Sequence, residues 1–137
     1  MEKITSHKDL IVWQKAIALA CRVYAATRLL PSDEGFDLAS ELRRAVVAIP
    51  SSIAEGAARQ GRADFIQYLH IARGSLAALE TQFMIASRQE SLSDTQAILR
   101  DIEDVGRLLT GLLRSLAASS RAAHAKACAN QPPAARL

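Results

Sequence analysis

The stretch Leu42–Arg59, LRRAVVAIPSSIAEGAAR, decides the fold class of this chain. Its larger apolar residues recur at steps of three and four, which places them on one face of a helix: Leu42, Val46, Ile49 and Ile53. Pro50 lies inside this pattern, where it removes a backbone donor and crowds the carbonyl four residues earlier. The stretch therefore predicts an amphipathic helix that kinks or breaks near Ile49, just before Pro50, and is held by packing on both sides.

Three further segments show the same helical periodicity. We expect helices over about residues 9–29 and 64–88 and from residue 93 onward, in addition to the helix from about 36–38 to 56–59. Ser6 with Asp9, and the SDTQ sequence from Ser93, fit capping boxes at two of the helix starts.

Composition supports an all-α protein, since half of the 137 residues are apolar, few are aromatic, and no period-2 alternation occurs. Short loops between long helices favour antiparallel neighbours, so the prediction is an up-down-up-down four-helix bundle over residues 1–120. Residues 121–137 form an Ala/Pro-rich basic tail, which we expect to be partly helical or mobile.

Several positions have a structural interpretation. Trp13 is expected to anchor the core near one end of the bundle, and Cys21 is expected to be buried as a small apolar side chain. Gly74 interrupts a helix interior, which suggests close approach of another backbone from the bundle or from another subunit. The doubled leucines of residues 98–116 widen the apolar stripe enough to face a neighbouring subunit as well.

Charge is distributed unevenly along the chain. Residues 1–104 hold 12 Lys/Arg against 14 Asp/Glu, whereas residues 105–137 hold five Lys/Arg and no acidic residue. The two parts therefore carry about −2 and +5, and the basic part suggests a polyanionic partner.

Four arginines at seven-residue spacing, called the arginine ladder here, carry this hypothesis: Arg100, Arg107, Arg114 and Arg121. A helix keeps such positions on one side, so the ladder fits a row of phosphates. The alternative is a solvated face, with helical ion pairs from Arg100 to Asp104 and from Glu103 to Arg107.

Arg43, Arg44 and Arg59 flank the proline-containing stretch and are further candidates for nucleic-acid contact. Arg73 requires a carboxylate if it points inward, and Glu55 and Glu80 are the candidates, because an unpaired buried charge is costly. A structural ion pair or subunit contact is the favoured interpretation of Arg73.

Catalysis finds little support in the sequence. His7, His70 and His124 have no metal-ligand spacing with cysteines or carboxylates, and no phosphate-binding loop or nucleophile motif occurs. We expect no enzyme activity, no metal and no cofactor. The polar N-terminus and the short apolar runs predict a cytoplasmic protein without a membrane segment.

Three segments in combination resemble a known family: LIVWQKA at residues 10–16, the LRRAVVAIPSSIAEGAAR stretch, and FIQYLHIARGSLAALETQ at residues 65–82. They are similar to the proteins encoded by intervening sequences in bacterial 23S rRNA genes. That family also includes the accessory variability determinant of diversity-generating retroelements. The resemblance covers about residues 6–115 and implies an antiparallel four-helix bundle, a homopentamer, and nucleic acid or a reverse transcriptase as partner. It implies roles in assembly or nucleic-acid contact for Arg43, Arg44, Glu55, Arg59 and Arg73.

The sequence thus favours a homo-oligomeric accessory protein that binds RNA or DNA phosphates with little sequence preference. The alternative is a protein-interaction or scaffold module, such as a reverse-transcriptase partner, that does not bind nucleic acid itself.

Overall fold

The computed structural model describes residues 6–28, 30, 37–89, 92 and 94–129. All regular secondary structure among these residues is helical. The elements are a short 3₁₀ helix η1 and four α-helices: η1 His7–Asp9, α1 Ile11–Thr27, α2 Leu38–Ala58, α3 Arg62–Gln89 and α4 Thr95–Ala129. No strand occurs among the described residues. The all-α prediction is therefore confirmed.

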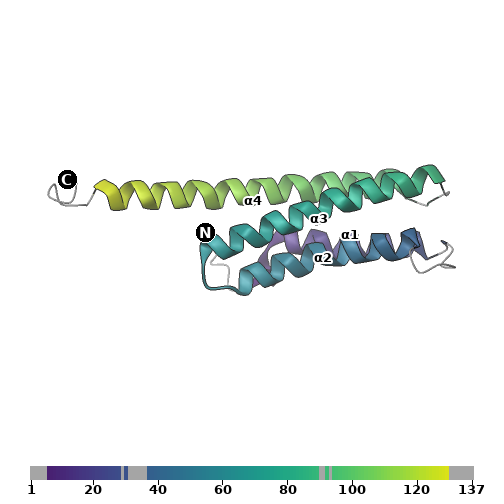
Figure 1. The fold of residues 1–137 in the computed structure, drawn as a ribbon, viewed down its shortest axis with the longest axis horizontal. Coiled ribbons are helices and arrows are strands. Elements are labelled where there is room, and N and C mark those ends of the chain that lie inside the picture. Colours follow the sequence, from purple (N-terminus) through teal and green to yellow (C-terminus); the bar gives the residue numbers. More distant parts are fainter. Residues whose placement is uncertain (1–5, 29, 31–36, 90–91, 93, 130–137) are drawn as a thin grey trace.

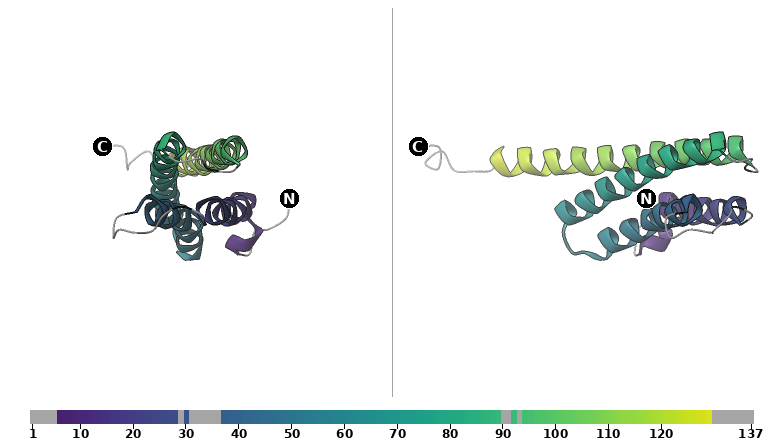
Figure 2. Two further views of the ribbon diagram at one scale, coloured as in Figure 1. Left: turned by 90° about the vertical axis from the view of Figure 1, so that its right-hand side faces the viewer. Right: turned by 45° about the vertical axis from the view of Figure 1, so that its right-hand side comes forward.

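The helices contact one another in a closed cycle. α1 packs against α2 and α4, and α3 packs against the same two helices (Figures 1 and 2). The most extensive contact is the one between α2 and α3. α2 continues through Pro50, which is buried, so the proline is accommodated inside one helix rather than ending it.

The core lies where the four apolar faces meet. The stripe predicted from the proline-containing stretch is fully buried, because Leu42, Val46, Ile49 and Ile53 each have no exposed surface. Phe83 of α3, Leu19 of α1 and Ile98 of α4 are equally buried and fill the space between the helices. The helical periodicity of the proline-containing stretch thus identified the inward face of α2 correctly, whereas on α1 the expected inward residues Ile17 and Tyr24 are exposed.

At Gly56, α2 and α3 approach each other closely. A Cβ at Gly56 would lie 2.6 Å from Tyr68 Cβ and 3.1 Å from Phe65 Cδ1, so only glycine lets α2 meet α3 there. Gly74, where the sequence suggested close approach, has nothing within 4 Å of a built Cβ. Within this chain, that suggestion for Gly74 was wrong, and only an approach from another subunit is left.

Helix starts agree with the sequence in part. Ser6 and Asp9 form the expected capping box, but they cap η1, and α1 begins two residues later at Ile11. Asp37 caps α2 through a 2.6 Å bond from the Ser40 backbone N–H. The capping box expected at Ser93 lies outside the described residues.

Cys21 is exposed, which contradicts the prediction that it is buried. The buried positions of α1 include Leu19 and Val23, each two residues from Cys21. Two residues correspond to about 200° on a helix, so the thiol faces away from the core.

The end of α4 projects beyond the other helices (Figure 1). The last buried residue of α4 is Leu113, and Leu116 and Ala117 are half-buried. Every described side chain from Ala118 to Ala129 is exposed. At about 1.5 Å per residue this part, called the α4 extension here, is roughly 18 Å long. The first nine residues of the expected tail, 121–129, therefore belong to a helix.

Candidate nucleic-acid interface

A groove between α3 and α4 brings three arginines together. Arg73 of α3 faces Arg107 and Arg114 of α4, around a volume of about 560 Å³. Small residues of α4 complete the lining: Gly106, Thr110 and Gly111. No acidic side chain lines this groove, although Arg107 pairs with Asp104 outside the lining. We call it the arginine groove.

Arg73 is exposed, and its Nη2 lies 3.2 Å from His70 Nδ1, one turn earlier on α3. It does not point into the core and needs no buried carboxylate. Glu55 and Glu80 are also exposed, and neither forms an ion pair with Arg73 in the described part of the chain. The pairing considered from the sequence is therefore absent, because all three side chains are solvated.

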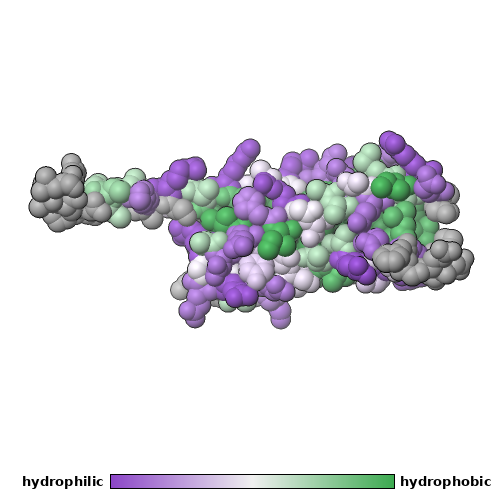
Figure 3. All heavy atoms as spheres, viewed as in Figure 1, coloured by the Kyte–Doolittle hydropathy of each residue, from purple (hydrophilic) through white to green (hydrophobic). Residues whose placement is uncertain are grey.

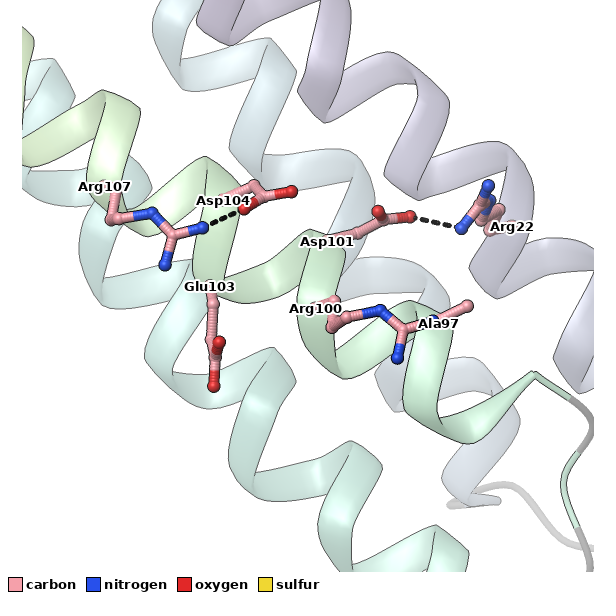
Figure 4. Close-up of a pocket in the computed structure, with 7 residues that line it drawn as sticks. All are labelled: Arg22, Ala97, Arg100, Asp101, Glu103, Asp104 and Arg107. Atoms are coloured by element: carbon pink, nitrogen blue, oxygen red, sulfur yellow. Dashed lines mark hydrogen bonds and ion pairs between the residues drawn. The ribbon is translucent and has the colours of Figure 1, made fainter.

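Arg107 forms an ion pair with Asp104, one turn earlier on α4. The two helical ion pairs predicted from the sequence, Glu103 with Arg107 and Arg100 with Asp104, do not form, so both predictions were wrong. Asp104 is only half exposed and lies on the same side as Arg107, whereas Glu103 points away from Arg107 (Figure 4). Within the described residues Arg100 has no ion pair.

A second hollow, of about 390 Å³, is also lined by Arg107, and Figure 4 shows its lining residues. Arg22 of α1 crosses to Asp101 of α4 there, with 2.9 Å between Nη1 and Oδ2. Its charged lining is balanced, with three arginines and three carboxylates: Arg22, Arg100, Arg107, Asp101, Glu103 and Asp104. A phosphate gains less here than in the arginine groove, because the carboxylates repel it.

The arginine ladder thus falls into two parts. Arg100 and Arg107 lie beside carboxylates, whereas Arg114 and Arg121 are exposed and have no ion pair among the described residues. Arg121 belongs to the α4 extension. In Figure 3 this extension shows hydrophilic and weakly hydrophobic side chains, without the strongly hydrophobic patches that the bundle shows. The ladder is most open to a polyanion at its C-terminal end.

The three arginine candidates of the proline-containing stretch contact their own chain. Arg43 Nε donates to Thr27 Oγ1 at 3.1 Å, and its Nη2 donates to the Thr27 carbonyl at 3.2 Å. Arg59 Nη2 donates to Tyr68 Oη at 2.8 Å. Arg44 is 3.6 Å from Glu41. In the described residues α2 does not contact α4, so these three arginines are not part of the arginine groove.

Trp13 is half-buried and packs against the core at the start of α1. Its ring meets His7 edge to face, with the ring centroids 5.0 Å apart. This contact agrees with the expected role as an anchor at one end of the helices.

Arg73 and the arginine ladder were predicted as separate features, and Gly106, Thr110 and Gly111 were not among the candidates. Gly106, just before Arg107, and Gly111, just after Thr110, were the sequence feature that could have indicated the groove. Because glycines have no side chain, they leave open the space that the arginine groove occupies.

The described residues hold no group of three or more potential metal ligands. They also include no helix with the length and apolar character of a membrane span.

Comparison with known proteins places the chain in a family. Residues 8–111 match the family model described as 23S rRNA-intervening sequence protein. A crystal structure from Bacteroides thetaiotaomicron VPI-5482, described as a protein of unknown function from the S23 ribosomal protein family, has a similar fold. The TM-score is 0.69 at 25% identity, over 78% of this chain and 98% of that one. No curated protein matches. Since the family model covers most of the sequence, the chain belongs to the 23S rRNA-intervening sequence proteins.

Proposed function

We propose that this chain is a non-enzymatic accessory protein of the cytoplasm that assembles as a homo-oligomer and binds the phosphates of RNA or DNA. One observation carries the proposal. Arg73, Arg107 and Arg114 converge on a groove that no acidic side chain lines. Guanidinium groups bind phosphate oxygens through two parallel hydrogen bonds, and binding releases counterions from the nucleic acid.

Recognition in this groove would be tolerant of sequence. Reading single-stranded bases requires open aromatic faces on which they stack. The rings of Tyr24 and Tyr68 are each covered by an arginine, Arg43 and Arg59, whose guanidinium carbon lies 5.3 Å from the ring centre. Neither ring lines the arginine groove. Affinity would therefore come from the backbone phosphates.

Exposed apolar side chains support the proposed assembly. Ile71 and Ile85 of α3 are 47% and 49% exposed, and Ala78 lies midway between them at seven-residue steps. Such spacing is typical of a seam between helices, and Gly74 on the same face leaves room for a second backbone. The proposed subunit is an antiparallel up-down-up-down bundle with α2 kinked at Pro50. The proposed assembly is the pentamer that the family resemblance implies.

Binding measurements test the proposal directly. Fluorescence anisotropy with labelled single-stranded RNA, structured RNA and duplex DNA is recorded over a salt series, on protein whose mass is fixed by light scattering. Substituting Arg73, Arg107 and Arg114 together by glutamine is expected to weaken binding. It should also reduce the slope of log affinity against log salt by about 0.9 per lost contact on duplex DNA.

A matched control removes the same charge elsewhere. Arg28, Arg62 and Arg88 are exposed and have no ion pair among the described residues, so their triple glutamine variant has the same net charge. If both triple variants lose affinity equally, only net charge matters and the arginine groove is not the site. No binding by the unmodified chain near physiological salt would reject the proposal.

The second candidate is a protein-interaction module, such as a partner of a reverse transcriptase. The exposed isoleucines of α3 favour it, because a partner helix would cover the same seam. A reverse-transcriptase gene beside this one, together with a protein complex that survives high salt and nuclease, would support this candidate over the first.

A further inference from the structure

A histidine and a cysteine lie together near the tip of the α4 extension. His124 and Cys128 are one helical turn apart, and both are exposed. Cys128 Sγ lies 3.5 Å from His124 Nε2. The family match ends at residue 111, so this pair is outside the part that the chain shares with its family.

The separation of the two atoms fits joint coordination of one metal ion. Zinc binds thiolate sulfur at about 2.3 Å and imidazole nitrogen at about 2.0–2.1 Å in a tetrahedral site. At the tetrahedral angle, roughly 109°, those two bond lengths put sulfur and nitrogen about 3.5 Å apart. The observed 3.5 Å between Cys128 Sγ and His124 Nε2 matches that separation.

The ligand types restrict the ion. Thiolate and imidazole suit zinc and its softer neighbours, whereas calcium and magnesium prefer oxygen ligands. Two ligands leave a tetrahedral site half filled. The described residues hold no group of three potential ligands, so they do not complete the site by themselves.

The α4 extension of a second copy of this chain would supply the two missing ligands. It projects past the other helices, and its described side chains contact nothing in the chain that would bury them (Figure 1). The extension continues the 35-residue helix α4, so it holds the pair away from the other helices and open to a partner. In a two-fold contact a residue near the axis meets its own copy, so two such tips would bring together two histidines and two cysteines.

We propose that His124 and Cys128 form half of a tetrahedral zinc-class site, and that the same pair from a second copy of this chain completes it. The two copies belong to facing assemblies, because the tips lie outside the bundle. Each thiol gives its proton to solvent as it binds, so one divalent ion releases two protons and the thiolates neutralise its charge. Arg121, one turn before His124 on α4, then lies beside a neutral centre instead of an added cation.

Cobalt titration of the reduced, full-length protein tests the site. Bound Co²⁺ is expected to show thiolate-to-metal charge transfer and the intense visible absorption of a tetrahedral ion, saturating at one ion per two chains. Zn²⁺ should double the mass of the assembly measured by light scattering, and a chelator should reverse the change.

Three single variants separate the site from unspecific binding. Cys128→Ser should abolish the charge-transfer band, and His124→Gln should weaken binding at least tenfold. Cys21→Ser is the matched control, because Cys21 is the other exposed cysteine and has no histidine one turn away. It should leave both measurements unchanged. Circular dichroism checks that all three variants keep their helices.

The result that overturns the site is an absent charge-transfer band, or a band that Cys128→Ser leaves intact. Saturation at one ion per chain, or an unchanged mass with metal bound, overturns completion by a second copy. Neither His124 nor Cys128 lines the arginine groove, so nucleic-acid binding and metal binding are measured independently of each other.

Discussion

Arg43 holds the C-terminal end of α1 through Thr27. Its Nε donates to the Thr27 hydroxyl at 3.1 Å and its Nη2 donates to the Thr27 carbonyl at 3.2 Å. The last carbonyls of a helix lack partners within the helix, and the Thr27 carbonyl accepts both from this arginine on α2 and from the Leu30 backbone N–H. The buried Thr27 hydroxyl in turn donates to the Val23 carbonyl at 2.8 Å.

Removing the two hydrogen bonds from Arg43 to Thr27 should lower the stability of the fold. Arg43→Gln loses both bonds to Thr27, and we expect urea unfolding to show a loss of roughly 1–2 kcal/mol. Arg44→Gln, next to it on the exposed side, should cost less than about 0.5 kcal/mol, since its pair with Glu41 is solvated. Equal losses from the two variants would contradict the role assigned to Arg43.

Two glycines of the chain should respond oppositely to alanine. Gly56→Ala places a Cβ 2.6 Å from Tyr68 Cβ, and neither backbone can withdraw without opening α2 from α3. We expect a loss of about 1–3 kcal/mol in the free energy of unfolding, measured by urea titration.

Gly74→Ala is the matched control, because nothing lies within 4 Å of its added Cβ. It should raise the stability of the single chain by up to about 1 kcal/mol through helix propensity. Light scattering on the same variant tests the proposed seam, where the added methyl group should weaken assembly. A stable Gly56→Ala protein would contradict the close approach.

Releasing Arg107 should strengthen nucleic-acid binding. Asp104→Asn removes the carboxylate that pairs with Arg107 beside the arginine groove. An exposed pair contributes up to about 1 kcal/mol, so affinity should rise by a factor of roughly two to five at low salt. Fluorescence anisotropy with labelled RNA measures this change.

Asp101→Asn provides the comparison for that experiment. It changes net charge by the same amount but frees Arg22, which does not line the arginine groove. If Asp101→Asn raised the affinity as much as Asp104→Asn does, the gain would reflect net charge alone.

The α4 extension should be dispensable for folding. Ending the chain at residue 118 removes only exposed described side chains, because the buried part of α4 ends at Leu113. The melting temperature should therefore stay within about 2 °C of the full chain, which calorimetry measures. Affinity for nucleic acid should fall, since Arg121 and Lys126 are lost. A large drop in melting temperature would show that the extension is packed in the assembly.

Much of the fold followed from periodicity. The steps of Leu42, Val46, Ile49 and Ile53 identified the buried face of α2, because one helical repeat and one core decide where those side chains lie. The same rule failed for Cys21. A free cysteine suits either environment, so its burial depended on where α1 placed its larger neighbours.

The candidate site was harder to predict, because it depends on distances between helices. Periodicity grouped the arginine ladder along α4, but only packing shows that Arg73 of α3 lies across the groove from it. Ion-pair partners were also missed, since the choice between Glu103 and Asp104 for Arg107 depends on side-chain direction within one turn. Close approach was assigned to Gly74 and found at Gly56, because a glycine in a sequence does not show which neighbour lies opposite.

The mismatch between the length of α4 and the length of the core has an evolutionary consequence. The core ends at Leu113, while the helix continues to Ala129. Selection for folding acts weakly on those last turns, so substitutions there can accumulate without harming the bundle. Differences between relatives in this segment should accordingly have no effect on folding, and positions conserved there should identify a contact that the extension makes.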